Sequence, residues 1–123
     1  MPYSIAYDVE KDYILVIVSG EFGLDLLRNL AREVGKIITE SGCTKILNDL
    51  RTAKPTPKIL EIYQMPQHAK NSGVSNTCKR ALVVGDRRDE FYFLETVFIN
   101  QGHSVNLFEN CDEALNWLFN SAK

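Results

Sequence analysis

The chain opens with two strand-like runs joined by a short polar link, and this pair constrains the fold more than any other feature. Residues 3–10 alternate between apolar and polar side chains, which is the period of a half-buried strand. Residues 13–18 form a second run rich in β-branched side chains, and residues 10–12 between them are polar. Two such runs with a short link predict an antiparallel hairpin at the start of a sheet.

Helical and strand-like patterns alternate after the hairpin. Residues 27–38 carry apolar side chains three and four positions apart, which predicts a helix with Asp25 in its first turn and Gly42 as its left-handed cap. Residues 19–23 and 54–57 contain glycine or proline and are predicted to interrupt the strands before them. Further strands are expected at 45–50, 81–84 and 104–109, and further helices after residue 57, around 91–98 and from residue 110.

This order, ββαβαβαβα, predicts an α/β domain with a mixed sheet opened by a β-hairpin. The length of 123 residues fits a single domain over residues 1–123. Asn110 is expected to cap the last helix, with Glu113 reaching back three residues. Residues 85–89 are expected to form a solvated turn before the helix at 91–98.

Composition excludes several classes of protein. Lys and Arg number 14 against 16 Asp and Glu, and they are spread along the chain, which argues against a nucleic-acid-binding protein. The opening residues lack the pattern of a secretory leader, and no apolar run approaches the ~20 residues that span a bilayer. Three cysteines at wide spacings predict neither a disulfide framework nor a zinc site, so we expect a cytoplasmic protein.

Asp49 is the most conspicuous candidate, because it lies near the end of a predicted central strand. Open α/β sheets place their ligands at this edge. A phospho-accepting aspartate is one interpretation, but it requires further acidic residues and a lysine at the same edge. The simpler interpretation, which we favour, pairs Asp49 with Arg51 or with backbone amides of the following residues.

Two threonines follow in the same segment. A phosphate on Thr52 or Thr56 would lie near the start of the next predicted helix, where amide donors are available. Thr56 is also a good cap for that helix, with Pro57 at the first helical position, and we favour this structural role. We do not expect phosphorylation of Thr52, because only Arg51 and Lys54 lie near enough in sequence to offset the charge.

No catalytic or metal-binding constellation is recognisable. His68 and His103 have no Cys or carboxylate at a ligand spacing, so no metal site and no cofactor are predicted. No nucleophile, base and orienting group occur together, so an enzyme is not expected. The helix at 91–98 is unusually aromatic. Core packing explains one side of it, and the excess suggests either an apolar cavity or a subunit contact. The candidate lining residues are Tyr63, Phe91, Leu94 and Phe98.

Four segments together resemble the STAS superfamily, in particular its SpoIIAA-like group of anti-sigma-factor antagonists. They are YSIAYDVEKDYILVIVSGEF, ILNDLR, KRALVVG and VNLFENCDEALNWLF. The resemblance implies a mixed sheet with helices mainly on one face. In such antagonists an Asp-Ser-Ser-Gly sequence after the third strand carries a phosphorylated serine. The matching residues here are 49–52, which keep the aspartate but not the serine or the glycine.

The resemblance implies a non-enzymatic regulatory module that acts through protein–protein contacts. The candidate partner-binding residues are Asp49, Arg51, Thr52, Lys54 and Thr56, and a homodimer is compatible with the aromatic surplus. The fold is also similar to lipid-binding domains of the CRAL-TRIO type. The alternative is therefore a carrier or sensor of a small apolar ligand such as a lipid.

Overall fold

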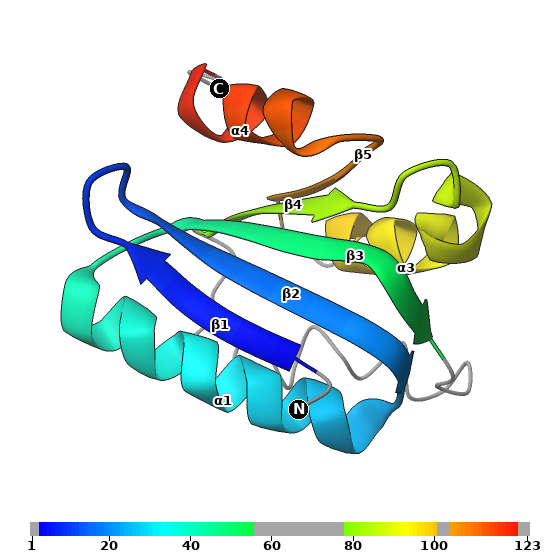
Figure 1. The fold of residues 1–123 in the computed structure, drawn as a ribbon, viewed down its shortest axis with the longest axis horizontal. Coiled ribbons are helices and arrows are strands. Elements are labelled where there is room, and N and C mark those ends of the chain that lie inside the picture. Colours follow the sequence, from blue (N-terminus) through cyan, green and yellow to red (C-terminus); the bar gives the residue numbers. More distant parts are fainter. Residues whose placement is uncertain (1–2, 56–77, 101–103, 121–123) are drawn as a thin grey trace.

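The computed structural model describes residues 3–55, 78–100 and 104–120. Five strands form one sheet in the order β1-β2-β3-β4-β5 (Figure 1). β1 and β2 are antiparallel, and the pairs from β2 to β5 are parallel. The mixed sheet opened by a hairpin is therefore confirmed. The helix predicted after residue 57 lies outside the described residues.

The hairpin consists of β1 (Tyr3–Asp8) and β2 (Tyr13–Phe22). Asp12 adopts a left-handed conformation with φ of 59°, and its amide donates to the Asp8 carbonyl at 2.8 Å. The Asp8 side chain accepts the Lys11 amide, and the Tyr7 hydroxyl donates to Asp12 at 2.7 Å. Short polar side chains thus satisfy the turn's backbone, which fixes the register of the two strands.

Helix α1 (Leu24–Ser41) connects β2 to β3 and has the predicted amphipathic character. Leu30 and Val34 are buried against the sheet, and Asp25 lies in the first turn. The helix ends at Gly42, whose φ is 75° and whose amide donates to the Ile38 carbonyl at 2.8 Å. The sequence prediction of this cap is confirmed.

The two faces of the sheet carry separate apolar clusters. Side chains of α1 and of α3 (Arg88–Asn100) join the larger cluster on one face, and α4 (Cys111–Asn120) packs on the other (Figure 1). The helices thus lie mainly on one face, as expected, with α4 as the exception. Alternate residues of the central strands supply both clusters: Ile46 faces α1 and α3, whereas Leu47 faces α4.

The first turn of α4 is held by the predicted capping residues. The Glu113 amide donates to the Asn110 side chain at 2.9 Å, and the Asn110 amide group donates back to the Glu113 carboxylate at 3.0 Å. Ala114 and Leu118 are buried on the inner side of the helix. The cap therefore fixes where α4 begins, immediately after β5 (Ser104–Phe108).

Two strands continue further than the sequence predicted. β2 runs through residues 19–22 to Phe22, and β3 (Lys45–Pro55) runs beyond Leu50, while β4 (Lys79–Val83) has about the expected length. The predicted breaks were wrong over residues 19–22 and 54–55, because each extension pairs with the other in parallel register. Residues 56–57 lie outside the described residues. Long-range pairing thus outweighs the weak strand propensity of both segments.

Gly42→Ala is expected to lower the free energy of unfolding by about 1 kcal/mol, because alanine is strained at a positive φ. No atom lies within 4 Å of the added Cβ, so the cost comes from the backbone and not from a clash. Urea denaturation measures the change. Gly42→Asn is the matched control and should cost less, since asparagine tolerates this conformation. Equal losses in both variants would contradict the explanation.

Candidate functional site at the end of strand β3

The second half of β3 is held against β2 by an irregular parallel ladder. Ile17 of β2 lies opposite Asp49, but Ser19 lies opposite Thr52. One residue of β2 thus faces two residues of β3, which is the geometry of a β-bulge. The extra residue of β3 changes which side chains point to each face of the sheet beyond that position.

Four predicted site residues lie on the face that carries α4, and the bulge turns two of them, Thr52 and Lys54, to that face. Leu50 and Ala53 are both buried on the opposite face, although three positions separate them. Since side chains alternate along a strand, the residues around them project to the other side. We call these four residues the β3 surface: Asp49, Arg51, Thr52 and Lys54. Only Asp49 is partly buried, and the other three are exposed.

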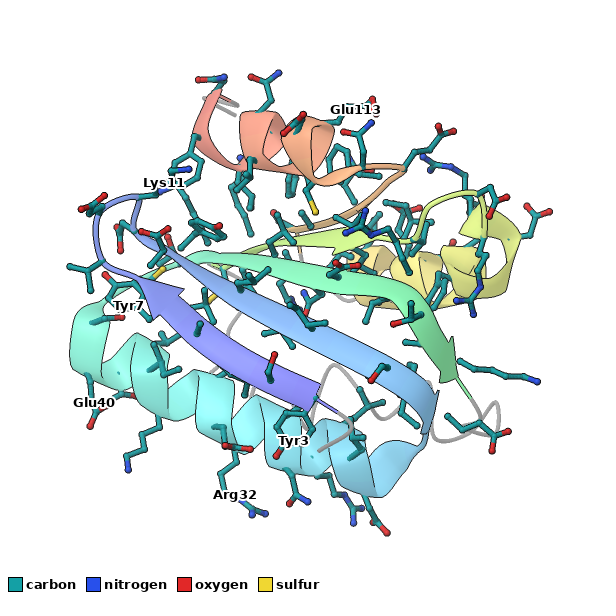
Figure 2. All side chains as sticks on the ribbon, in the orientation of Figure 1. Tyr3, Tyr7, Lys11, Arg32, Glu40 and Glu113 are labelled. Carbon is teal, nitrogen blue, oxygen red and sulfur yellow. The ribbon has the colours of Figure 1, made fainter. Side chains whose placement is uncertain are left out.

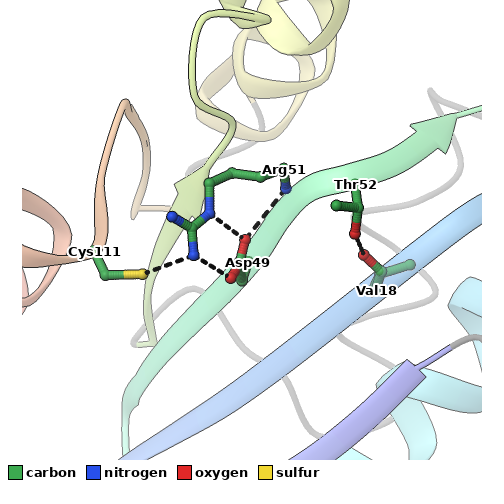
Figure 3. A network of polar contacts seen from close by, with 5 residues as sticks. All are labelled: Val18, Asp49, Arg51, Thr52 and Cys111. Carbon is green, nitrogen blue, oxygen red and sulfur yellow. Dashed lines mark hydrogen bonds and ion pairs between the residues drawn. The ribbon is translucent and has the colours of Figure 1, made fainter.

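Asp49 and Arg51 form a two-pronged ion pair (Figure 3). Arg51 Nε donates to one carboxylate oxygen at 2.9 Å, and Nη2 donates to the other at 2.7 Å. The Arg51 amide also donates to the Asp49 carboxylate, at 3.2 Å. These bonds, first of all those of the Arg51 side chain, lower the pKa of Asp49. Asp49 is thus paired with Arg51 and with its backbone amide, which is the interpretation that the sequence favoured.

Three further residues surround Arg51. Arg87 donates through Nη1 to the Arg51 carbonyl at 3.0 Å, and Arg51 Nη2 lies 3.7 Å from Cys111 Sγ. Gly85 has a positive φ of 64°, and a Cβ there would lie 3.7 Å from Arg51 Cγ. Burial raises the pKa of the Cys111 thiol, so the sulfur beside Arg51 is uncharged at neutral pH.

Thr52 and Lys54 extend the surface along the strand. Thr52 Oγ1 donates to the Val18 carbonyl at 3.5 Å, a long bond across the bulge (Figure 3). Lys54 lies directly opposite Glu21 in the register of β2 and β3, so opposite charges face each other on neighbouring strands. Thr52 therefore sits within a paired strand and not in a loop, which corrects the expectation of a loop here.

The structure brings together some of the predicted residues and not others. Thr56 and Tyr63 lie outside the described residues. Phe91 is fully buried in the larger core cluster, and its ring lies 5.5 Å from the Arg87 guanidinium. Leu94 and Phe98 are on α3, and their side chains are not described.

Sequence reasoning missed the part played by Arg87 and Cys111. The expected turn is found over residues 85–87, and α3 already begins at Arg88. Nothing local in the sequence shows that Arg87 reaches the backbone of β3. A signal was available in the topology: parallel neighbours end at the same edge of a sheet, so the residues after β4 and β5 lie near the end of β3. The capping pair at the start of α4 then places Cys111 at this edge.

Comparison with known proteins gives structural matches alone. No family model and no curated protein matches the chain. A protein of the DUF3478 family from Shewanella loihica PV-4, described as having a SpoIIAA-like fold, aligns with 14% identity and a TM-score of 0.62, covering 94% of this chain and 93% of that one. The chain has a SpoIIAA-like fold.

Two further solved structures support this assignment. An anti-sigma factor antagonist from Mycobacterium paratuberculosis has 14% identity and a TM-score of 0.61, covering 94% of this chain and 93% of its own. The anti-sigma factor antagonist SpoIIAA in its unphosphorylated form has 8% identity and a TM-score of 0.54, with 90% and 91% coverage. The predicted SpoIIAA-like fold is thus confirmed across nearly the whole chain.

Metal-binding clusters, disulfides and membrane-spanning helices are not found among the described residues. No group of three or more His, Cys, Asp and Glu side chains there could hold a metal ion. All three cysteines are free thiols. No helix in the described ranges is long and apolar enough to cross a membrane. The β3 surface is therefore the candidate functional site.

Asp49→Asn is expected to lower the free energy of unfolding at neutral pH by about 1 kcal/mol or less, since Arg51 is half exposed. The pKa of Asp49 is lowered on folding, so its contribution is complete above the ordinary value of 3.8 and is lost as the pH falls through the folded value. As the pH is lowered, the unfolding free energy of the variant should therefore fall less steeply than that of the native protein.

Urea denaturation at neutral pH and at several pH values below 3.8 measures this difference. Asp86→Asn is the matched control, because Asp86 is an exposed aspartate in the turn after β4. An Asp49→Asn variant with the same acid dependence as the native protein would show that the ion pair does not contribute to stability.

Proposed function

We propose that this chain is a cytoplasmic, non-enzymatic regulatory module that binds a protein partner through the β3 surface. The SpoIIAA-like fold supports a role of this kind, since two of the matching structures are described as anti-sigma factor antagonists. The single observation that carries the proposal is the Asp49–Arg51 pair, which holds an exposed arginine in a fixed orientation near the C-terminal end of β3.

A pre-ordered arginine suits protein recognition for two reasons. Arginine is enriched among the residues that dominate binding energy, and a side chain that is already fixed loses little conformational entropy on binding. Arg51 is held by Asp49 at its side chain and by Arg87 at its carbonyl, yet 49% of its side chain remains exposed. The guanidinium therefore has donors left to offer to a partner.

The same ion pair argues against catalysis by Asp49. A general base at neutral pH works best with a pKa near that pH, whereas Arg51 lowers the pKa of Asp49. The carboxylate oxygens are also occupied by donors from Arg51. A structural carboxylate that orients the arginine accounts for both observations.

We do not expect a phosphorylation switch at Thr52. The residue belongs to segment 49–52, which the sequence resemblance matches to the serine-bearing sequence of the antagonists, but it lies in a strand paired with Ser19. A phosphate would add about two negative charges beside the Asp49 carboxylate, which already offsets the charge of Arg51. Partner binding in this proposal is thus controlled by something other than modification of Thr52.

The alternative, a carrier of a small apolar ligand, has less support. Its best-placed candidate, Phe91, is fully buried among the core side chains that join α1 and α3 to the sheet. A residue in that position stabilises the core whether or not a ligand is present. The partner-binding proposal instead rests on side chains that are exposed.

Site-specific photo-cross-linking in the cells that make this protein tests the proposal. A photoreactive amino acid in place of Lys54 should give a defined protein adduct, because Lys54 lies on the β3 surface. Lys11 is the matched control: it is also an exposed lysine, but it lies in the hairpin turn at the other end of the sheet (Figure 2). Equal adducts from both positions, or none from position 54, would contradict the proposal.

Arg51→Ala should then abolish the adduct formed from position 54, and Arg51→Lys should weaken it severalfold. Lysine keeps the charge but cannot make the two-pronged contact with Asp49, so its orientation is lost. An adduct that forms equally well in both variants would mean that the pre-ordered arginine does not take part in recognition.

A further inference from the structure

The two edges of the sheet differ in how their backbone groups are satisfied. At β5, the Phe108 carbonyl accepts the Val84 amide, so the neighbouring Leu107 points its backbone groups away from β4. Both of these groups are occupied by side chains of α3. Glu95, itself buried, accepts the Leu107 amide at 2.9 Å, and Arg88 donates to the Leu107 carbonyl at 3.3 Å. An incoming strand is thus blocked at this edge.

No described residue protects the β1 edge in this way. In the described part of the chain, β1 pairs with β2 alone, along all six of its residues and without a register shift. Proteins usually guard an exposed edge with lysine, proline or a bulge. β1 has none of these, and its single charged residue, Asp8, stands at its end. Within residues 3–55, 78–100 and 104–120, nothing therefore blocks the outer edge of β1 to another strand.

The sequence of β1 is nearly symmetric about Ile5. Tyr3 and Tyr7 flank it on the same face, where all three pack against the larger core cluster. Ser4 and Ala6 flank it on the other face, and both are exposed. A strand with this pattern is complementary to a second copy of itself run in the opposite direction.

The geometry points to a symmetric dimer in which β1 of one copy pairs antiparallel with β1 of another, centred on Ile5. Tyr3 then lies opposite Tyr7 of the second copy, and Ser4 opposite Ala6. Aromatic residues directly opposite each other stabilise antiparallel pairs, and small residues opposite each other leave the second face flat. Asp8 is the single charged residue of β1 and lies at its end, so no like charges meet between residues 3–7 of the two strands.

The Ser4→Lys/Ala6→Lys double variant tests the proposal, because it places like charges opposite each other twice in the proposed register. Sedimentation velocity should show a concentration-dependent dimer for the native protein and a monomer for this variant. Both residues are exposed, so the variant should stay folded, as circular dichroism can confirm. Asn116→Lys/Asn120→Lys is the matched control on exposed positions of α4 and should still dimerise.

A mixing experiment fixes the register. The Ser4→Glu/Ala6→Glu variant should also be monomeric alone, but an equimolar mixture with the double-lysine variant should restore the dimer through opposite charges. A native protein that stays monomeric at every concentration up to its solubility limit would overturn the proposal. So would dimers of the double-lysine variant as stable as those of the native protein. These outcomes are independent of cross-linking at position 54, since that position lies on another strand.

Discussion

The parallel pairing of β2 with β3 continues through the bulge to Phe22 and Pro55, and the β3 surface depends on it. Without these last pairs, residues 52–55 would be a loop with no defined face. With them, Ala53 is anchored in the core and its neighbours project to the face that carries α4. The bulge is the local irregularity that allows Leu50 and Ala53 to face the same core while Arg51 and Thr52 both stay exposed.

Local patterns allowed much of this fold to be predicted. The alternation of the hairpin, the apolar stripe of α1, Gly42 as its cap and the Asn110–Glu113 pair each involve residues close together in the chain. The ion pair of Asp49 with Arg51, two residues apart, belongs to the same class. Such features depend on a few neighbouring side chains, so their sequence carries the necessary information.

The features that escaped prediction depend on distant residues. The ends of β2 and β3 contain glycine, proline and polar side chains, and they are strands only because they pair with each other. Arg87 reaches β3 because the turn after β4 lies beside it, and Glu95 is buried because it satisfies an amide of β5. No pattern within one segment reports a contact between two segments, so these interactions required the structure.

Two separate surfaces follow from this architecture: an ordered, charged one at the end of β3 and an edge at β1 that no described residue covers. The β3 surface depends on residues 52–54 being a stable strand. Hydrogen exchange followed by nuclear magnetic resonance tests this most directly, because paired amides exchange only when the ladder opens. The account predicts that hydrogen-bonded amides in this segment are protected as strongly as those at 46–49. Exchange at the rate of an unpaired loop would contradict it.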